Sequence, residues 1–180
     1  MPLRTAYQHA LLRNRTDEAR LLADLGASTA VAPADEAVAA VARGERPESP
    51  LPDELDPDPQ EVLILAALRG QLDAVIAAVG ADFAGVVGGS PKGSLVQQAA
   101  WIGDAGLVTR LLTLGADPNP PAQTGTPLAW AAHGSAAYAL PGRDYVAVAE
   151  AISRAGNEID LELVQVAQGP LYEWLAQRAA

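Results

Sequence analysis

The sequence contains no cysteine, which excludes disulfide bonds, thiolate zinc sites and thiol nucleophiles together. Only 4% of its residues are aromatic although 49% are hydrophobic, so a core must be built mainly from Ala, Leu and Val. Basic side chains are also scarce: 12 Lys and Arg stand against 22 Asp and Glu, a formal net charge of −10. This charge argues against a nucleic acid or an anionic membrane as the main partner, and its simplest role is to keep the protein soluble.

Long apolar runs are missing as well. We find no stretch of about 18 apolar residues, and we therefore expect no membrane span. Residues 1–5 lead directly into a helical pattern and lack the apolar core of a signal peptide. Together with the absence of cysteine, these features favour a cytoplasmic location.

The most regular stretch, residues 93–126, predicts two short helices joined by a turn. We expect the first helix over about 95–101, followed by Gly103, and the second over about 106–114, ending at Gly115. The proline-rich residues that follow cannot continue a helix. Because so small a unit cannot bury its apolar side chains alone, it needs similar units on either side.

Similar units occur along most of the chain at an interval of 32 or 33 residues, as between Glu61, Ser94 and Thr126. We predict a single array with units over about residues 5–33, 34–59, 60–92, 93–125 and 126–159, and a helical cap over 160–180. Its remaining helices are expected over about residues 6–13, 17–24, 34–44, 60–69, 72–79, 126–132 and 145–154.

The sequence also predicts how these helices are packed and joined. Leu21, Leu22 and Leu25 are expected to line the inner side of the second helix of the N-terminal unit. Long loops are expected over residues 81–91 and 133–143, where glycine and proline cluster.

The second unit, residues 34–59, is incomplete. Its residues 45–59 hold five prolines and many acidic residues, so they cannot form the second helix. We expect an extended or single-turn segment instead, with Leu51 and Leu55 in contact with the array. Two interpretations remain open: a degenerate repeat with a long loop, or an acidic arm over residues 45–61 that docks a basic partner.

Residues 111–132 carry two motifs, Leu111-Leu112-x-x-Gly115-Ala116-Asp117-x-Asn119 and Thr126-Pro127-Leu128-x-x-Ala131-Ala132. With related residues elsewhere, these motifs resemble the ankyrin repeat over roughly residues 5–159. The resemblance implies an all-α solenoid of stacked helix-turn-helix units, and the long insertions favour a bacterial source.

The histidine of the family motif is absent: Gln8, Ile64, Gln97 and Ala129 stand in its place. In ankyrin repeats this histidine normally ties adjacent turns together by hydrogen bonds. Its loss implies looser ties between repeats, or a stack in which other contacts take the place of these hydrogen bonds.

The resemblance also implies that a partner protein binds on a concave face, formed by the turns and the ends of the first helices. Exposed Trp near Arg is typical of interaction hot spots. The alternative for Trp101 and Trp130 is that they pack between repeats. The candidate residues are Leu12, Arg13, Leu68, Arg69, Trp101, Ile102, Trp130 and His133.

No catalytic, cofactor-binding or metal-binding residue is predicted. His9 and His133 lie far apart in the sequence, and neither spacing suggests a metal site or a nucleophile with its base. Residues 88–94 are rich in glycine but lack the residue order of a phosphate-binding loop. We therefore expect a monomeric, non-enzymatic module that binds another protein. The alternatives are an immunity-type inhibitor that masks a basic partner with residues 45–61, and an enzyme whose site is not recognisable.

Overall fold

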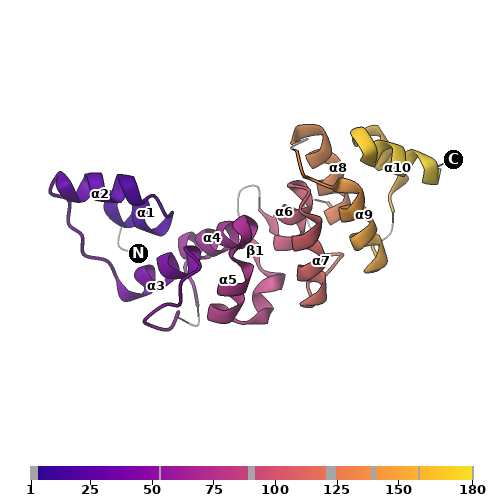
Figure 1. Cartoon of the computed structure of the whole chain (residues 1–180). Coiled ribbons are helices and arrows are strands. Elements are labelled where there is room, and N and C mark those ends of the chain that lie inside the picture. Colours follow the sequence, from indigo (N-terminus) through magenta and orange to yellow (C-terminus); the bar gives the residue numbers. More distant parts are fainter. Residues whose placement is uncertain are drawn as a thin grey trace. The chain divides into compact units, whose positions relative to one another are not determined.

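The computed structural model describes residues 4–52, 54–88, 92–120, 125–138, 141–157 and 159–179 (Figure 1). The chain is 64% helix and 2% strand, which confirms the all-α prediction. It divides into two compact units, Met1–Phe83 and Ala84–Ala180, which we call the N-terminal and C-terminal units. The single continuous array therefore stays a prediction, and each unit is described by itself.

The N-terminal unit begins with a helical hairpin. Helix α1 packs against α2 and also against α3, and α3 packs in turn against α4 and α5. The helix bounds are α1 (Ala6–Leu12), α2 (Thr16–Asp24), α3 (Pro33–Ala42), α4 (Pro57–Ala66) and α5 (Leu72–Val79), with the π-helical turn η1 (Ala67–Gln71) between α4 and α5 and the 3₁₀ turn η2 (Ala81–Gly85) after α5.

Helix α4 begins at Pro57, three residues before the predicted start at Gln60. Prolines were expected to limit this segment to an extended chain or a single helical turn. Pro57 and Pro59 instead occupy the first turn of α4, where backbone N–H groups have no partner inside the helix, so the missing donors cost nothing. Before this helix, residues 45–52 and 54–56 are free of helix, as predicted.

The prediction that Leu21, Leu22 and Leu25 form a buried stripe is wrong. Leu21 is 59% exposed and Leu25 is 75% exposed, while Leu22 is half-buried. Helix α2 packs chiefly against α1, and the described residues between α3 and α4 form no helix that could pack on its other side.

Among the described residues, one helical run, Pro57–Val79, has the length and composition of a membrane span, although no span was expected from the sequence. Its mean hydropathy is 1.9, and 39% of its most apolar window is buried. Gly70 interrupts the run with a φ of 97°, and the helices on both sides of it pack against α3. Core helices often satisfy the same two criteria, so the run is weak evidence for a span.

The C-terminal unit contains two helical hairpins whose helices lie against one another (Figure 1). Helix α6 packs against α7 and α8, α9 packs against α7 and α8, and α10 packs against α8, α9 and η3. The elements are β1 (Val87–Gly88), which pairs antiparallel with β2 (Gly93–Ser94), then α6 (Leu95–Trp101), α7 (Ala105–Thr113), α8 (Pro127–Ala137), α9 (Tyr145–Arg154), the 3₁₀ turn η3 (Leu161–Gln165) and α10 (Gly169–Ala179).

Two predicted loops are shorter than expected. Part of residues 81–91 forms η2 and β1, and residues 89–91 lie outside the described part of the chain. Helix α8 continues through Gly134 to Ala137 instead of ending at Ala132. Gly134 acts here as a packing residue, because a Cβ atom at this position would lie 2.0 Å from the carbonyl oxygen of Trp101.

Gln8 and Gln97, which stand where the ankyrin repeat that the sequence resembles has histidine, each connect a helix cap to a distant carbonyl. Thr5 and Ser94 cap α1 and α6, and the side chains of Gln8 and Gln97 accept hydrogen bonds from the backbone N–H groups of these caps. The other end of each amide donates to a distant carbonyl: Gln8 to Ala30, at 2.8 Å, and Gln97 to Gly125. Other side chains therefore supply hydrogen bonds at these two positions, which is the second of the two expectations.

Tyr145 joins the two helical hairpins of the C-terminal unit. Its ring is buried, and its hydroxyl lies 3.0 Å from the carbonyl oxygen of Trp101 and 3.1 Å from that of Gly134. The hydroxyl donates to these oxygens, one at the end of α6 and one within α8. Burial raises the pKa of Tyr145 above its ordinary value of 10.0, because the phenolate would be poorly solvated there.

Tyr145→Phe should lower the free energy of unfolding by about 1 kcal/mol, since the carbonyl oxygen of Trp101 loses this donor, whereas that of Gly134 still accepts from the backbone N–H of Tyr138. The raised pKa means that the folded state holds the proton more tightly than the unfolded chain. Its stabilising contribution is therefore complete below pH 10.0 and is lost as the pH rises through the folded pKa. We expect urea midpoints of the wild type to fall above that pH more steeply than those of Tyr145→Phe. Equal slopes would contradict this role for the hydroxyl.

Candidate functional site

The predicted partner-binding residues fall into two groups, one in each unit. Leu12, Arg13, Leu68 and Arg69 belong to the N-terminal unit, and Trp101, Ile102, Trp130 and His133 to the C-terminal unit. We therefore treat them as two separate candidate surfaces.

The first surface is a cavity of about 270 Å³ in the N-terminal unit, which we call the arginine pocket. Two left-handed turn residues position its basic side chains: Asn14, with a φ of 55°, follows Arg13, and Gly70, with a φ of 97°, follows Arg69. Leu68 is half-buried beside this turn. The lining residues are Leu12, Arg13, Asn14, Arg15, Ala42, Glu61, Val62, Leu65, Ala66, Arg69 and Gln71.

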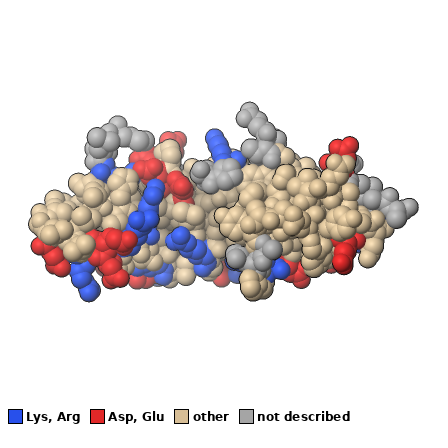
Figure 2. Space-filling view, turned by 90° about the horizontal axis from the view of Figure 1, so that it is seen from above, with Lys and Arg blue, Asp and Glu red and all other residues tan. Residues whose placement is uncertain are grey.

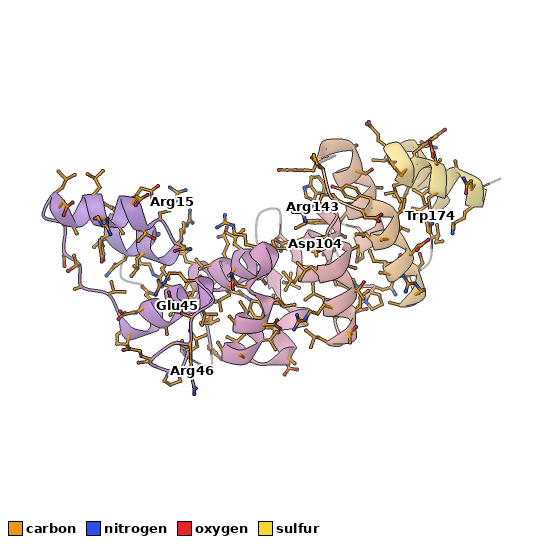
Figure 3. The ribbon with its side chains drawn as sticks, viewed as in Figure 1. Arg15, Glu45, Arg46, Asp104, Arg143 and Trp174 are labelled. Carbon is orange, nitrogen blue, oxygen red and sulfur yellow. The ribbon has the colours of Figure 1, made fainter. Side chains whose placement is uncertain are left out.

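The arginine pocket is basic although the protein as a whole is acidic. Arg13 and Arg69 are exposed, and within the described ranges neither makes an ion pair. Arg15, labelled in Figure 3, lies 3.9 Å from Glu18 at the surface, a distance at which pairing is weak. Glu61 contributes the one acidic side chain among the lining residues. Figure 2 shows Arg side chains over the N-terminal unit, with Asp and Glu side chains among them.

The sequence predicted Arg13 and Arg69 but missed Arg15, Glu61 and Leu65. A signal for the basic character was present. Three times in the N-terminal unit, an arginine stands just before a residue with positive φ. These pairs are Arg13 before Asn14, Arg43 before Gly44 and Arg69 before Gly70. Arg43 differs from the other two because Glu45 lies 2.7 Å from it, and this hydrogen-bonded pair raises the pKa of Arg43 and lowers that of Glu45.

The second surface lies at the end of α6 and on α8, and we call it the aromatic surface: Trp101, Ile102, His133 and Tyr138. Trp101 and Ile102 are half-buried, His133 is exposed and Tyr138 is 48% exposed. The Trp101 ring meets Tyr138 edge-on, with centroids 6.0 Å apart. Tyr138 was not predicted, because it falls in a segment that the sequence indicated as a loop.

Trp130 does not belong to the aromatic surface, which corrects its place among the candidates. It is only 6% exposed and packs edge-on against Trp101, with centroids 5.9 Å apart. A Cβ atom at Gly93 would lie 2.8 Å from its ring. The alternative of packing inside the fold therefore holds for Trp130, and this buried ring supports Trp101 from below.

The turn beside the aromatic surface is held by an ion pair. Asp104 caps α7 by accepting from the backbone N–H of Leu107 at 3.0 Å. Its other oxygen lies 3.1 Å from Arg143, which stands just before α9 (Figure 3). This contact joins the start of α7 to the start of α9. It therefore fixes the turn that follows Ile102.

Part of the acidic segment is engaged within the N-terminal unit. Arg4 forms two hydrogen bonds of 2.9 Å with Asp35 and lies 3.2 Å from Asp58 and 4.0 Å from Asp56. These contacts, the bond to Asp35 first, raise the pKa of Arg4. Asp53 lies outside the described residues.

Hydrophobic contacts hold the same segment, as the sequence indicated. Leu51 and Leu55 are half-buried and line a cavity together with Ala78, Val79 and Phe83. The residues between α3 and α4 thus pack on α5.

Within the described ranges, no group of three or more His, Asp or Glu side chains is arranged to hold a metal ion. His9 is exposed on α1, and the described part of residues 88–94 forms the short β1–β2 pair. Comparison of the chain with models of known protein families found no match, and comparison with curated proteins found none either.

Proposed function

We propose that the protein is an ankyrin-like repeat protein, without enzymatic activity, that binds another protein through the aromatic surface. The observation that carries this proposal is the arrangement of three rings: Trp101 and Tyr138 reach the surface while the buried Trp130 supports them. Partly exposed aromatic side chains in a fixed position lose little entropy on binding and are enriched among interaction hot spots.

Recurring local features support the repeat interpretation. Thr5, Ser94 and Thr126 each cap a helix through the side-chain oxygen, which accepts from the backbone N–H three residues later. Left-handed residues follow the first helices at Asn14 and Gly103, and they follow second helices at Gly26, Gly115 and Gly156. In the C-terminal unit, α6 lies on α8 and α7 lies on α9, as expected for stacked repeats.

The acidic masking alternative has less support. Asp56 and Asp58 lie against Arg4, and Glu45 lies against Arg43. These three carboxylates already have basic neighbours within the chain, so a basic partner would have to compete with these surface pairs. A cytoplasmic location, a bacterial source and a monomeric state accompany our proposal as further expectations.

Capture of a partner from a lysate tests the proposal, with Tyr138→Ala as the variant and Tyr172→Ala as its control. The two tyrosines are matched in exposure, at 48% and 49%, but Tyr172 lies on α10, away from the aromatic cluster. Tyr138→Ala should weaken capture at least about tenfold, as truncation of a hot spot does, and Tyr172→Ala should leave it unchanged. Tyr138 is preferable to Trp101, whose loss would also remove packing against Trp130. Equal capture by both variants would count against the aromatic surface.

A further inference from the structure

We infer that the arginine pocket binds an acidic peptide segment of the partner, with an aliphatic side chain between its carboxylates. This inference rests on the proposed function and adds the chemistry of the bound segment. It is independent of the aromatic surface, because the pocket lies wholly within the N-terminal unit.

Charge complementarity is the first argument. Three arginines line the cavity against one acidic residue, Glu61, in a protein whose formal net charge is −10. Most basic side chains of such a protein would be expected to pair internally, as Arg4 and Arg43 do. Arg13 and Arg69 are exposed and, in the part of the chain that the structure describes, have no ion-pair partner. Their planar guanidinium groups are suited to carboxylates, with which they form paired hydrogen bonds.

The apolar wall and the size of the cavity indicate the rest of the ligand. Leu12, Val62 and Ala66 are buried beneath the arginines, and Leu65 beside them is 37% exposed. A volume of about 270 Å³ is at the lower limit for pockets that hold whole small molecules, so one or two side chains are a better fit. An aliphatic side chain on the apolar wall would place flanking carboxylates near the arginines.

A peptide fits this cavity better than a nucleic acid. The lining residues include no aromatic ring on which a base could stack. Glu61 would also repel a phosphate backbone, whose charges are continuous, whereas a peptide can place a neutral residue opposite it. The same geometry therefore favours alternating acidic and apolar side chains.

Fluorescence anisotropy with the full-length protein tests this inference. The probe is a short fluorescein-labelled peptide with a central leucine flanked by glutamates. Arg13→Ala and Arg69→Ala should each weaken binding about threefold and the double variant about tenfold, as expected for surface charges whose effects add. Arg20→Ala removes an exposed arginine of α2 that does not line the pocket, and it should bind as the wild type does. Serine in place of the leucine should weaken binding about tenfold.

Three results would overturn the inference: no binding of the probe at low salt, equal binding of a peptide with lysine in place of glutamate, or stronger binding of a single-stranded oligonucleotide. An equal loss in Arg20→Ala and Arg69→Ala would do the same, since only the net charge would then matter. These failures differ from failure of the proposed function. If the probe does not bind but Tyr138→Ala still abolishes capture, the arginine pocket is not the peptide site, and the proposal that the aromatic surface binds the partner is retained.

Discussion

Gly134→Ala is expected to lower the free energy of unfolding of the C-terminal unit by at least about 3 kcal/mol, because overpacking against rigid backbone is costly. The new methyl group would lie 2.0 Å from the carbonyl oxygen of Trp101, so α8 would have to move away from α6. That movement would also separate the two carbonyl oxygens to which Tyr145 donates. Packing and hydrogen bonding are thus lost together.

Gly106→Ala is the matched control for this change. Gly106 is also a helical glycine, on α7, but an added Cβ would meet only Asp104, at 3.6 Å. Alanine is the better helix former, so this variant should be neutral or more stable by up to about 1 kcal/mol. Trp101, Trp130 and Trp174 all belong to the C-terminal unit, so urea unfolding followed by tryptophan fluorescence reports on this unit. Similar midpoints for both variants would mean that α8 does not need the close approach.

The short helices could be predicted from the sequence because their ends are determined locally. Helices α5, α6 and α9 have the bounds that the sequence indicates. In α6, Ser94 and Gln97 form a complete capping box at the start, and Gly103 supplies a left-handed residue after the end. Each signal involves residues only a few positions apart, so it can be recognised without knowledge of the fold.

Features that depend on distant residues could not be predicted in the same way. Gly134 was interpreted as the start of a loop, because nothing in its neighbourhood shows that Trp101 lies against it. Leu21 and Leu25 have the spacing of core residues, yet their exposure follows from the absence of a helix more than twenty positions later. Trp130 could equally have been buried or exposed, and only the packing of α8 on α6 decides this.

In the candidate site, too, some features depend on neighbouring residues and others on residues far apart in the sequence. Arg13 and Arg69 could be selected because both stand at the end of a first helix, before a turn residue. Their convergence on one cavity depends on the packing of α1 and α4 on α3, which also brings Glu61 and Leu65 to it. The role of Arg4 was missed because its three partners are 31 to 54 positions away.

Arg4→Ala is expected to lower the free energy of unfolding of the N-terminal unit by about 2 kcal/mol, because the partly buried Asp35 loses its charged hydrogen-bond donor. Asp35 is 7% exposed and lies in the first turn of α3, where Arg4 forms two hydrogen bonds with it. Without Arg4 its carboxylate would be left buried and unpaired. Asp56 and Asp58 would lose their partner too, so the segment before α4 should become more sensitive to proteolysis.

A second variant separates the ion pair from the helix terminus. Glu36 is exposed and occupies the same first turn of α3, so Glu36→Ala removes a similar favourable charge from the helix N-terminus without exposing a buried group. Glu36→Ala should lower the free energy of unfolding by less than about 1 kcal/mol.

The double variant Arg4→Met with Asp35→Leu should recover much of the stability lost in Arg4→Ala, because apolar residues often replace a buried pair at little cost. Circular dichroism records these changes, and since no tryptophan lies before residue 84, fluorescence midpoints should move less. If the double variant is as unstable as Arg4→Ala, the stability depends on the packing of these side chains and not on an uncompensated charge.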